Sequence, residues 1–312
     1  MQYTRREIGK LAVGLLSRTG RLAARQTKPN SLVRGVQIAM NAPYNFGSNY
    51  MPADEVLSRC VQLGVSAVEL RAQPVEGALA PAGLVAATAP VPKADVTPER
   101  LAAQKAAQSE LAKWRLTAPM DQVRAFRKKY EDAGVRIEIV KFDAIYARPD
   151  AEIDYCFNLA KNLGARAISC EIDRAQTRKL GQFADKHQLM VGYHGHAETT
   201  AAHWEEAFSQ AKFNGANLDI GHFVVGNKTS PIPFLTAQHA RITHIHVKDR
   251  KMTGPNVPFG EGDTPIVETL QLIRDNRWNI QATIEFEYEV PAGSDRMKEI
   301  AKCVEYCRKA LA

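Results

Sequence analysis

Short apolar runs rich in β-branched residues alternate with amphipathic stretches along the chain from residue 33 onward. The runs have the length of strands and are bounded by turn residues, whereas the stretches between them have helical periodicity. Strands that alternate with helices form a parallel sheet. Eight strands are predicted, at Gly35–Met40, Ala67–Arg71, Ile137–Phe142, Ala167–Ile172, Met190–His194, Ala216–Asp219, Ile242–Val247 and Ala282–Phe286.

The amphipathic stretches between these runs are predicted to be helices. Gly64, Gly134 and Gly164 directly follow three of them, at the position where a left-handed C-cap favours glycine. The predicted helices include Ala53–Leu63, Gln122–Ala133, Ile153–Leu163, His203–Phe213, Ile266–Arg274 and a final one at Arg296–Leu311.

Eight strand–helix units within residues 31–312 predict an α/β protein, a (β/α)₈ TIM barrel that forms one domain. The alternative is a doubly wound open sheet, which carries a Gly-x-Gly-x-x-Gly turn after its first strand when it binds a dinucleotide. The sequence has no such turn after Met40. The barrel is therefore the favoured fold.

An alanine- and proline-rich insertion, residues 74–121, separates the second predicted strand from its helix. Within it, Pro98–Trp114 has the pattern of a helix. An insertion after a strand lies on the C-terminal face of a barrel, where active sites form. The segment is interpreted as a lid, as the assembly surface of a homo-oligomer, or as an excursion without either role.

The net charge of +7 comes entirely from the N-terminal segment. Residues 1–34 hold eight basic side chains and one acidic one, whereas the remaining residues hold 33 of each. A neutral body argues against nucleic acid as a partner, because phosphate binding requires a positively charged surface. No apolar run approaches the roughly 18 residues of a membrane span, so no membrane partner is expected.

Residues 1–30 are excluded from the predicted barrel. Thr4–Lys10 contains Arg5 and Arg6 and resembles a bacterial twin-arginine export signal, and a short apolar stretch follows it at Leu11–Leu16. A functional signal would make the protein periplasmic or exported. Otherwise the segment is a disordered basic tail and the protein is cytoplasmic.

Five of the eight histidines and several acidic residues lie in or just after predicted strands. The ends of consecutive strands converge in a barrel, so side chains far apart in the sequence can surround one ion. Imidazole and carboxylate groups together suit a borderline divalent cation such as Mn²⁺, Zn²⁺, Fe²⁺ or Co²⁺. The residues are His194, His196, His222, His244, His246, Glu171, Asp219, Glu285 and Glu287.

Four motifs follow one another on the last four predicted strands. They are Tyr193-His194-Gly195-His196, Asn217-Leu218-Asp219-Ile220-Gly221-His222, Thr243-His244-Ile245-His246-Val247-Lys248-Asp249-Arg250 and Thr283-Ile284-Glu285-Phe286-Glu287. With these motifs the chain resembles the xylose-isomerase-like superfamily of TIM barrels, the sugar phosphate isomerase/epimerase family, over about residues 33–312. The resemblance implies a divalent-metal-dependent isomerase or epimerase that acts on a sugar or sugar derivative.

The resemblance also implies one metal ion, held by one residue from each of these four strands. Mn²⁺ is the ion most strongly implied, with Zn²⁺, Co²⁺, Fe²⁺ and Mg²⁺ as alternatives. Strand periodicity leaves open whether His196 or Glu287 replaces its neighbour two residues earlier, because such pairs share a strand face. By motif, the implied ligands are His194, Asp219, His246 and Glu285.

The same motifs supply candidate substrate-binding residues. His222 resembles a residue that contacts substrate hydroxyls, and Lys248 or Arg250 could bind an oxyanion or remain a solvated loop charge. The chain has neither a glycine-rich phosphate loop nor an arginine cluster at a strand end. The expected partner is therefore a small unphosphorylated sugar or oxo-sugar.

Abstraction of a proton next to a carbonyl requires a base as well as stabilisation of the enolate. The candidates for acid and base are Glu171, His196 and Glu287. Return of the proton gives an isomer or epimer, whereas loss of a β-substituent gives a lyase, either a dehydratase or an oxo-glycoside eliminase. The epimerases that the chain resembles usually carry a glutamate where it has His194, and this departure keeps the lyase as the alternative. A non-catalytic sugar-binding barrel and an apurinic nuclease are less favoured.

Overall fold

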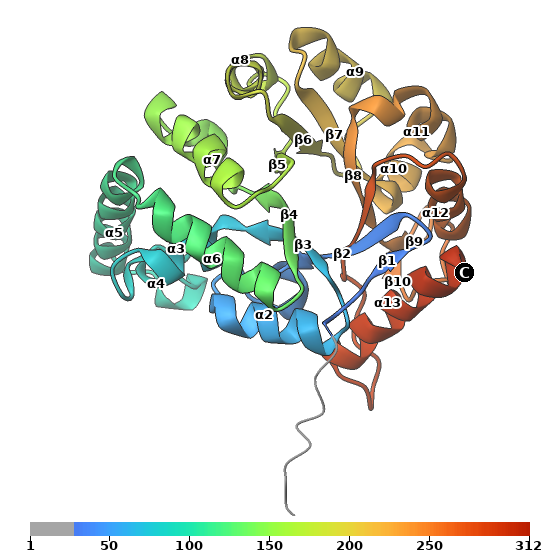
Figure 1. Ribbon diagram of the computed structural model, residues 1–312, viewed down its shortest axis with the longest axis horizontal. Helices are drawn as coiled ribbons and strands as arrows, with labels where there is room; N and C mark the ends of the chain where they lie inside the picture. The colour runs from blue at the N-terminus through green and yellow to red at the C-terminus, as the bar shows by residue number, and fades with distance from the viewer. Residues whose placement is uncertain (1–27) are drawn as a thin grey trace, which may run out of the picture.

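The computed structural model describes residues 28–312, so the predicted export signal lies outside the described residues. The predicted TIM barrel is confirmed. Eight parallel strands close into one barrel, because the first of them pairs with both the second and the last (Figure 1). The strands are β2 (Val36–Ala42), β3 (Ala67–Arg71), β4 (Arg136–Lys141), β5 (Ala167–Glu171), β6 (Met190–His194), β7 (Asn214–Asp219), β8 (Ile242–Val247) and β11 (Gln281–Ile284).

Three short strands lie outside the parallel barrel. The strand β1 (Leu32–Val33) pairs antiparallel with β2, and β9 (Asp249–Arg250) pairs with β10 (Asn256–Val257) just after β8. The last barrel strand ends at Ile284, two residues earlier than predicted. Glu285 and Glu287 therefore lie beyond the regular strand, at the mouth of the barrel.

Helices surround the barrel (Figure 1). The six predicted ones occur with ends within three residues of the expected positions, whereas α8, α10 and α11 were not predicted. No helix among residues 28–312 is both long and apolar enough to cross a membrane. The surrounding helices are α2 (Ala53–Gln62), α6 (Met120–Asp132), α7 (Asp150–Asn162), α8 (Thr177–His187), α9 (Ala201–Gln210), α10 (Ile220–Asn227), α11 (Ile232–Gln238), α12 (Ile266–Asp275) and α13 (Arg296–Leu311).

The apolar core lies between the barrel and its helices, and the interior of the barrel is polar. Successive residues of a strand point to opposite faces. In β8, Ile245 and Val247 belong to the apolar core, whereas the side chains of His244 and His246 lie near Glu69 of β3. This alternation places the polar residues of the motifs inside the barrel.

The insertion consists of helices that pack at the side of the barrel. It begins directly after β3 with α3 (Ala72–Leu79) and α4 (Leu84–Ala87), which were not predicted, and continues with α5 (Pro98–Leu116), which confirms the predicted helix. Figure 1 shows these helices beside α6 and α7. Arg115 of α5 binds Glu76 of α3 at 2.8 Å and Glu152 of α7 at 2.9 Å, so a buried ion network fastens the insertion to the barrel.

We expect Arg115→Ala to lower the free energy of unfolding by about 3 kcal/mol, because it leaves the carboxylates of Glu76 and Glu152 buried without their cation. Urea denaturation measures the change. The matched control is Arg100→Ala, which removes an exposed ion pair with Asp95 at 3.0 Å in the same insertion and should cost less than about 1 kcal/mol. Equal losses for the two variants would contradict this account of the insertion.

Candidate metal centre

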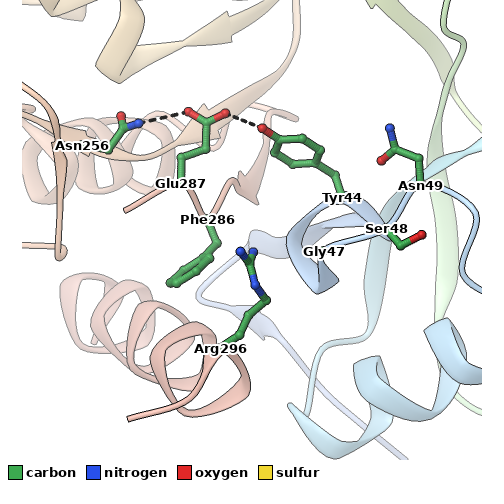
Figure 2. A pocket seen from close by; sticks show the side chains of 8 residues that line it. All are labelled: Tyr44, Gly47, Ser48, Asn49, Asn256, Phe286, Glu287 and Arg296. Carbon is green, nitrogen blue, oxygen red and sulfur yellow. Dashed lines mark hydrogen bonds between the residues drawn. The ribbon is translucent and has the colours of Figure 1, made fainter. Parts of the chain in front are cut away.

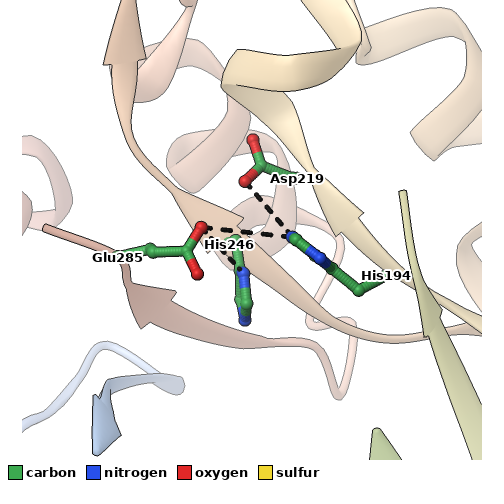
Figure 3. A group of neighbouring side chains, drawn as sticks. All are labelled: His194, Asp219, His246 and Glu285. Atoms are coloured by element: carbon green, nitrogen blue, oxygen red, sulfur yellow. Dashed lines mark ion pairs between the residues drawn. The ribbon is translucent and has the colours of Figure 1, made fainter. Parts of the chain in front are cut away.

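The four residues implied as metal ligands meet at the C-terminal end of the barrel (Figure 3). One nitrogen or carboxylate oxygen of each lies within 4.8 Å of the corresponding atoms of the other three. His194 Nε2 is 3.5 Å from Asp219 Oδ2, and His246 Nδ1 is 3.3 Å from Glu285 Oε2. From the two pairs that strand periodicity left open, the structure thus brings His194 and Glu285 into this group.

Two of the four side chains are oriented from the β5–β7 side of the barrel. His194 lies with Nδ1 at 2.8 Å from Oε2 of Glu171, which ends β5. Asp219 ends β7 and caps α10, because its Oδ1 accepts a hydrogen bond of 2.7 Å from the backbone N–H of His222. In each residue the second polar atom, Nε2 or Oδ2, faces the group.

The other two side chains are oriented by buried residues of β2 and β3. His246 Nε2 lies 2.5 Å from Oε2 of Glu69 on β3, and Glu285 Oε1 accepts a hydrogen bond of 2.8 Å from Asn41 Nδ2 on β2. A metal-binding histidine usually donates its other ring N–H to a carboxylate or carbonyl group, which fixes the orientation of the ring. Glu69 and Glu171 occupy that position for His246 and His194.

The two imidazole nitrogens that face this group have no hydrogen-bond partner among the described residues, and the two carboxylate oxygens are contacted by the Lys248 ammonium. The four atoms are His194 Nε2, Asp219 Oδ2, His246 Nδ1 and Glu285 Oε2, and all four are buried. A buried polar atom without a partner costs about 1–3 kcal/mol. The convergence of these four buried atoms fits a divalent cation with two imidazole and two carboxylate ligands.

Lys248 lies beside the group and contributes positive charge. Its Nζ is 3.0 Å from Asp219 Oδ2 and 2.6 Å from Oε2 of both Glu285 and Glu287. Burial opposes the charged form, but the neighbouring carboxylates outweigh it and raise the pKa of Lys248 above its ordinary value. The lysine stem crosses Gly221, where a Cβ atom would lie 2.5 Å from Lys248 Cγ. This contact explains the glycine in the Asp219–His222 motif.

The carboxylates at this end of the barrel outnumber its lysines. The two lysines are Lys248 and Lys141, and Lys141 Nζ is paired with Glu171 at 2.8 Å. Burial lowers the pKa of His246, but the charges of Glu285 and Glu69 prevail and raise it to about 10. The environment therefore favours an additional cation. The carboxylates at this end are Glu69, Glu171, Asp219, Glu285 and Glu287.

The predicted catalytic residues lie on two sides of the group. Glu171 is bound by His194, by His196 Nε2 at 2.8 Å and by Lys141. Burial would raise the pKa of Glu171, but these contacts hold it well below its usual range, which favours a positioning role over that of a base. The hydrogen bond to Glu171 raises the pKa of the half-exposed His196. On the other side, Glu287 accepts a hydrogen bond of 2.7 Å from the Tyr44 hydroxyl.

The structure also brings the three candidate substrate-binding residues together. His222 Nδ1 is 2.8 Å from Arg250 Nη1, and His222 Nε2 is 3.1 Å from Lys248 Nζ. Burial lowers the pKa of His222 to about 4, so the imidazole is neutral near pH 7. Arg250 has no acidic partner among residues 28–312. It is available to bind an oxygen of a ligand.

A loop after β8 is fixed at the mouth of the barrel by Asp249. The Asp249 carboxylate accepts hydrogen bonds from the backbone N–H groups of Gly260 at 2.8 Å, Gly262 at 2.9 Å and Thr264 at 3.2 Å. A Cβ atom at Gly262 would lie only 1.9 Å from Asp249 Oδ1, so this approach requires glycine. Within the motif on β8 and β9, Lys248 thus contacts the carboxylates of the centre, while Asp249 binds the backbone of the loop.

Glu69, Asn41 and Tyr44 are among the residues of the site that were not predicted as functional. Glu69 had a visible signal, because it is a lone acid between apolar residues of a predicted strand. Asn41 and Tyr44 carried none, since their contacts depend on β11 lying next to β2 in the closed barrel.

Comparison with known proteins supports the family resemblance. Residues 166–310 match the sequence family described as the xylose isomerase-like TIM barrel. This range contains all four grouped residues, and the closed barrel extends the agreement to the fold of the described chain. The resemblance to xylose isomerase-like TIM barrels is thereby confirmed. A comparison with curated protein sequences finds no significant match.

Solved structures share the fold at low sequence identity. D-psicose 3-epimerase, in the presence of D-fructose, is 13% identical with a TM-score of 0.54, and the alignment covers 88% of this chain and 97% of that one. The probable 3-DHS dehydratase AsbF from Bacillus anthracis is 12% identical, with a TM-score of 0.59 and coverage of 87% and 99%. A xylose isomerase-like TIM barrel protein from Mycobacterium smegmatis, in complex with magnesium, is 14% identical, with a TM-score of 0.51 and coverage of 88% and 96%. These likenesses establish the fold.

We expect the purified protein to bind about one equivalent of Mn²⁺ per chain, and Asp219→Ala to lose this binding. Glu69→Gln should weaken it by about 10–100-fold, because His246 loses the carboxylate that orients it. Titration with Mn²⁺, followed by electron paramagnetic resonance, measures both effects.

The control for the metal titration is Glu138→Gln, which alters a carboxylate on β4 that pairs with Arg136 at 2.7 Å. This variant should bind Mn²⁺ like the wild type. Undiminished binding in Asp219→Ala would show that the four residues are not the metal site.

Proposed function

We propose that the protein is a divalent-metal-dependent isomerase or epimerase of a sugar or sugar derivative, which acts by removing a proton next to a carbonyl. The observation that carries this proposal is the convergence of four buried ligand atoms, from two histidines and two carboxylates, at the mouth of the barrel. Mn²⁺ is the expected ion, and Zn²⁺, Co²⁺, Fe²⁺ and Mg²⁺ also suit nitrogen and oxygen ligands. Such an ion, when bound, supplies Lewis-acid stabilisation of the negative charge that develops on substrate oxygen atoms.

His196 and Glu171 form a proton-transfer pair on the β5–β6 side of the centre. The contact with Glu171 orients the His196 ring and favours its protonated form. The ring is half exposed, and its centroid lies 4.8 Å from that of His194 and 4.9 Å from that of His222. His196 therefore borders both the metal ligands and the predicted substrate-binding residues, which is the position a general acid or base requires.

Glu287 and Tyr44 form a second proton-transfer pair on the β11–β2 side. Burial, together with the hydrogen bond to Glu287, raises the pKa of Tyr44 and keeps its hydroxyl protonated. The strand order places β11 and β2 across the barrel from β5 and β6. A sugar held between them would have a proton-transfer group on each face. Epimerisation needs this arrangement, because one group removes the proton and the other returns it to the opposite face.

Lys248 and Arg250 complete the charge arrangement around the substrate. The Lys248 ammonium lies where negative charge would grow on an oxygen near the centre, and a positioned cation stabilises such charge without reorganisation. Arg250 and the neutral His222 can bind hydroxyl groups of the sugar. These residues account for orientation of the substrate, whereas the two proton-transfer pairs account for the chemistry.

A lyase that uses the same enolate is the second candidate. It is favoured by His194 at the end of β6, where the epimerases that the chain resembles carry a glutamate. With an imidazole there, one proton-transfer pair would remove the proton and the other would protonate a departing β-substituent. A dehydratase and an epimerase both occur among the proteins of similar fold, which is consistent with either outcome.

We expect the metal-loaded protein, incubated in D₂O with a panel of ketoses and oxo-glycosides, to introduce deuterium at a carbon next to the carbonyl. Glu287→Gln should slow both exchange and product formation by about 10²–10⁴-fold, because it removes the carboxylate that would accept the proton, whereas the His196 ring, whose protonated form is favoured, would act as the donor. Proton NMR follows both the exchange and the product.

The matched control is Glu289→Gln, an exposed carboxylate two residues further along, which should leave exchange and product formation unchanged. An unsaturated sugar in place of an epimer would assign the protein to the lyases. Absence of exchange with every substrate of the panel would refute both candidates.

A further inference from the structure

A hollow of about 560 Å³ lies beside the metal centre at the mouth of the barrel. Tyr44, Ser48 and Asn49 line one wall and follow β2, while Phe286 and Glu287 follow β11 (Figure 2). Both segments leave the C-terminal ends of their strands. The hollow therefore opens on the same face of the barrel as the proposed active site.

The hollow and the metal centre share one wall. Glu287 lines the hollow, and its Oε2 accepts a hydrogen bond of 2.6 Å from Lys248 Nζ. The same ammonium lies 2.6 Å from Oε2 of Glu285. The hollow therefore directly adjoins the residues that surround the centre.

The lining of the hollow is suited to hydroxyl groups. Ser48 and Asn49 offer neutral donors and acceptors. Asn256 donates to Glu287 through Nδ2 at 3.3 Å, but its buried Oδ1 accepts no hydrogen bond among the described residues. Hydroxyl groups are the donors that satisfy such an acceptor. The Tyr44 ring, fixed through its hydroxyl to Glu287, adds the aromatic surface against which the C–H face of a sugar can pack.

We propose that this hollow binds a second sugar ring, so that the substrate is a disaccharide or another glycoside rather than a single sugar. The proposal rests on the proposed function, since the reacting ring occupies the metal centre. It adds the substrate class, which the metal ligands alone do not define.

Other ligand classes fit the lining less well. An apolar group would leave Asn256 and the other polar atoms without partners, at a cost of about 1–3 kcal/mol for each buried group. A phosphate would face the carboxylate of Glu287. Arg296, the one cation that lines the hollow among residues 28–312, already lies over the Phe286 ring at 5.1 Å and donates to the backbone carbonyl of Asn45. A neutral ring with several hydroxyls meets none of these penalties.

The test compares fructose with the keto-disaccharides lactulose and isomaltulose, which carry the same reacting ketose with a second ring attached. We expect the wild-type protein to show a higher kcat/KM for deuterium exchange with at least one disaccharide. Ser48→Trp fills the hollow and should lower kcat/KM for that disaccharide by about 10-fold or more, while the value for fructose stays within about 2-fold. Asn49→Ala, a milder change, should act in the same direction.

Ser109→Trp is the matched control, because it adds the same side chain at an exposed position of α5 in the insertion. It should not alter kcat/KM for either class of sugar. Equal kcat/KM values for fructose and the disaccharides in the wild-type protein, unchanged in Ser48→Trp, would overturn the second-ring site while leaving the proposed function intact.

Calorimetric titration with unreacted cellobiose, maltose and glucose separates failure of the site from failure of the chemistry. The site predicts that a disaccharide binds more tightly than glucose and that Ser48→Trp removes the difference. That result, in the absence of exchange with any ketose, would support the second-ring site and refute the proposed enolate chemistry. Equal affinities for all three sugars would overturn the site.

Discussion

Carboxylates buried inside the barrel impose the constraint that organises the site. An ionised acid removed from water is stable only where hydrogen bonds and opposite charge replace its hydration. The chain divides this task between the two oxygens of each acid. One oxygen of Glu285 is bound by Asn41 and one oxygen of Asp219 caps α10, while the second oxygen of each faces the centre. The site therefore carries buried negative charge that Lys248 neutralises only in part, and an additional cation would stabilise it.

The same division explains why the site is assembled from so many strands. A metal ligand with one free atom and one bound atom can rotate little, so its geometry is set before any ligand arrives. Three of the four ligands are held by a residue from another strand, as His246 of β8 is by Glu69 of β3, whereas Asp219 is held by the backbone N–H of His222. The closed barrel brings these strands around one axis, whereas the apolar core outside it stabilises the fold. Substitutions inside the barrel should therefore affect binding more than packing.

The fold could be predicted almost entirely from local pattern, and the ligand group from pattern together with family resemblance. Strand lengths, the glycines after helices and the order of the motifs are local signals. The supporting residues could not be predicted in this way, because the roles of Asn41 and Glu69 depend on which strands face one another across the barrel. The contacts of Glu171 could not be predicted for a related reason. Its sequence position indicates a carboxylate near the centre. Only the structure shows that this carboxylate is already bound by Lys141, His194 and His196.

In the proposed mechanism, Glu287 would link proton transfer to recognition of the rest of the substrate. Its carboxylate binds Tyr44 and Lys248 and also forms part of the wall of the adjoining hollow. A second ring bound in that hollow would exclude water from Glu287 and strengthen its interaction with the Lys248 ammonium, because electrostatic interactions grow as solvent is removed. Binding energy from a part of the substrate that does not react would then contribute to the chemical step itself. A glycoside would thus gain both affinity and rate from the same contacts, whereas a single sugar would leave that side of the site hydrated.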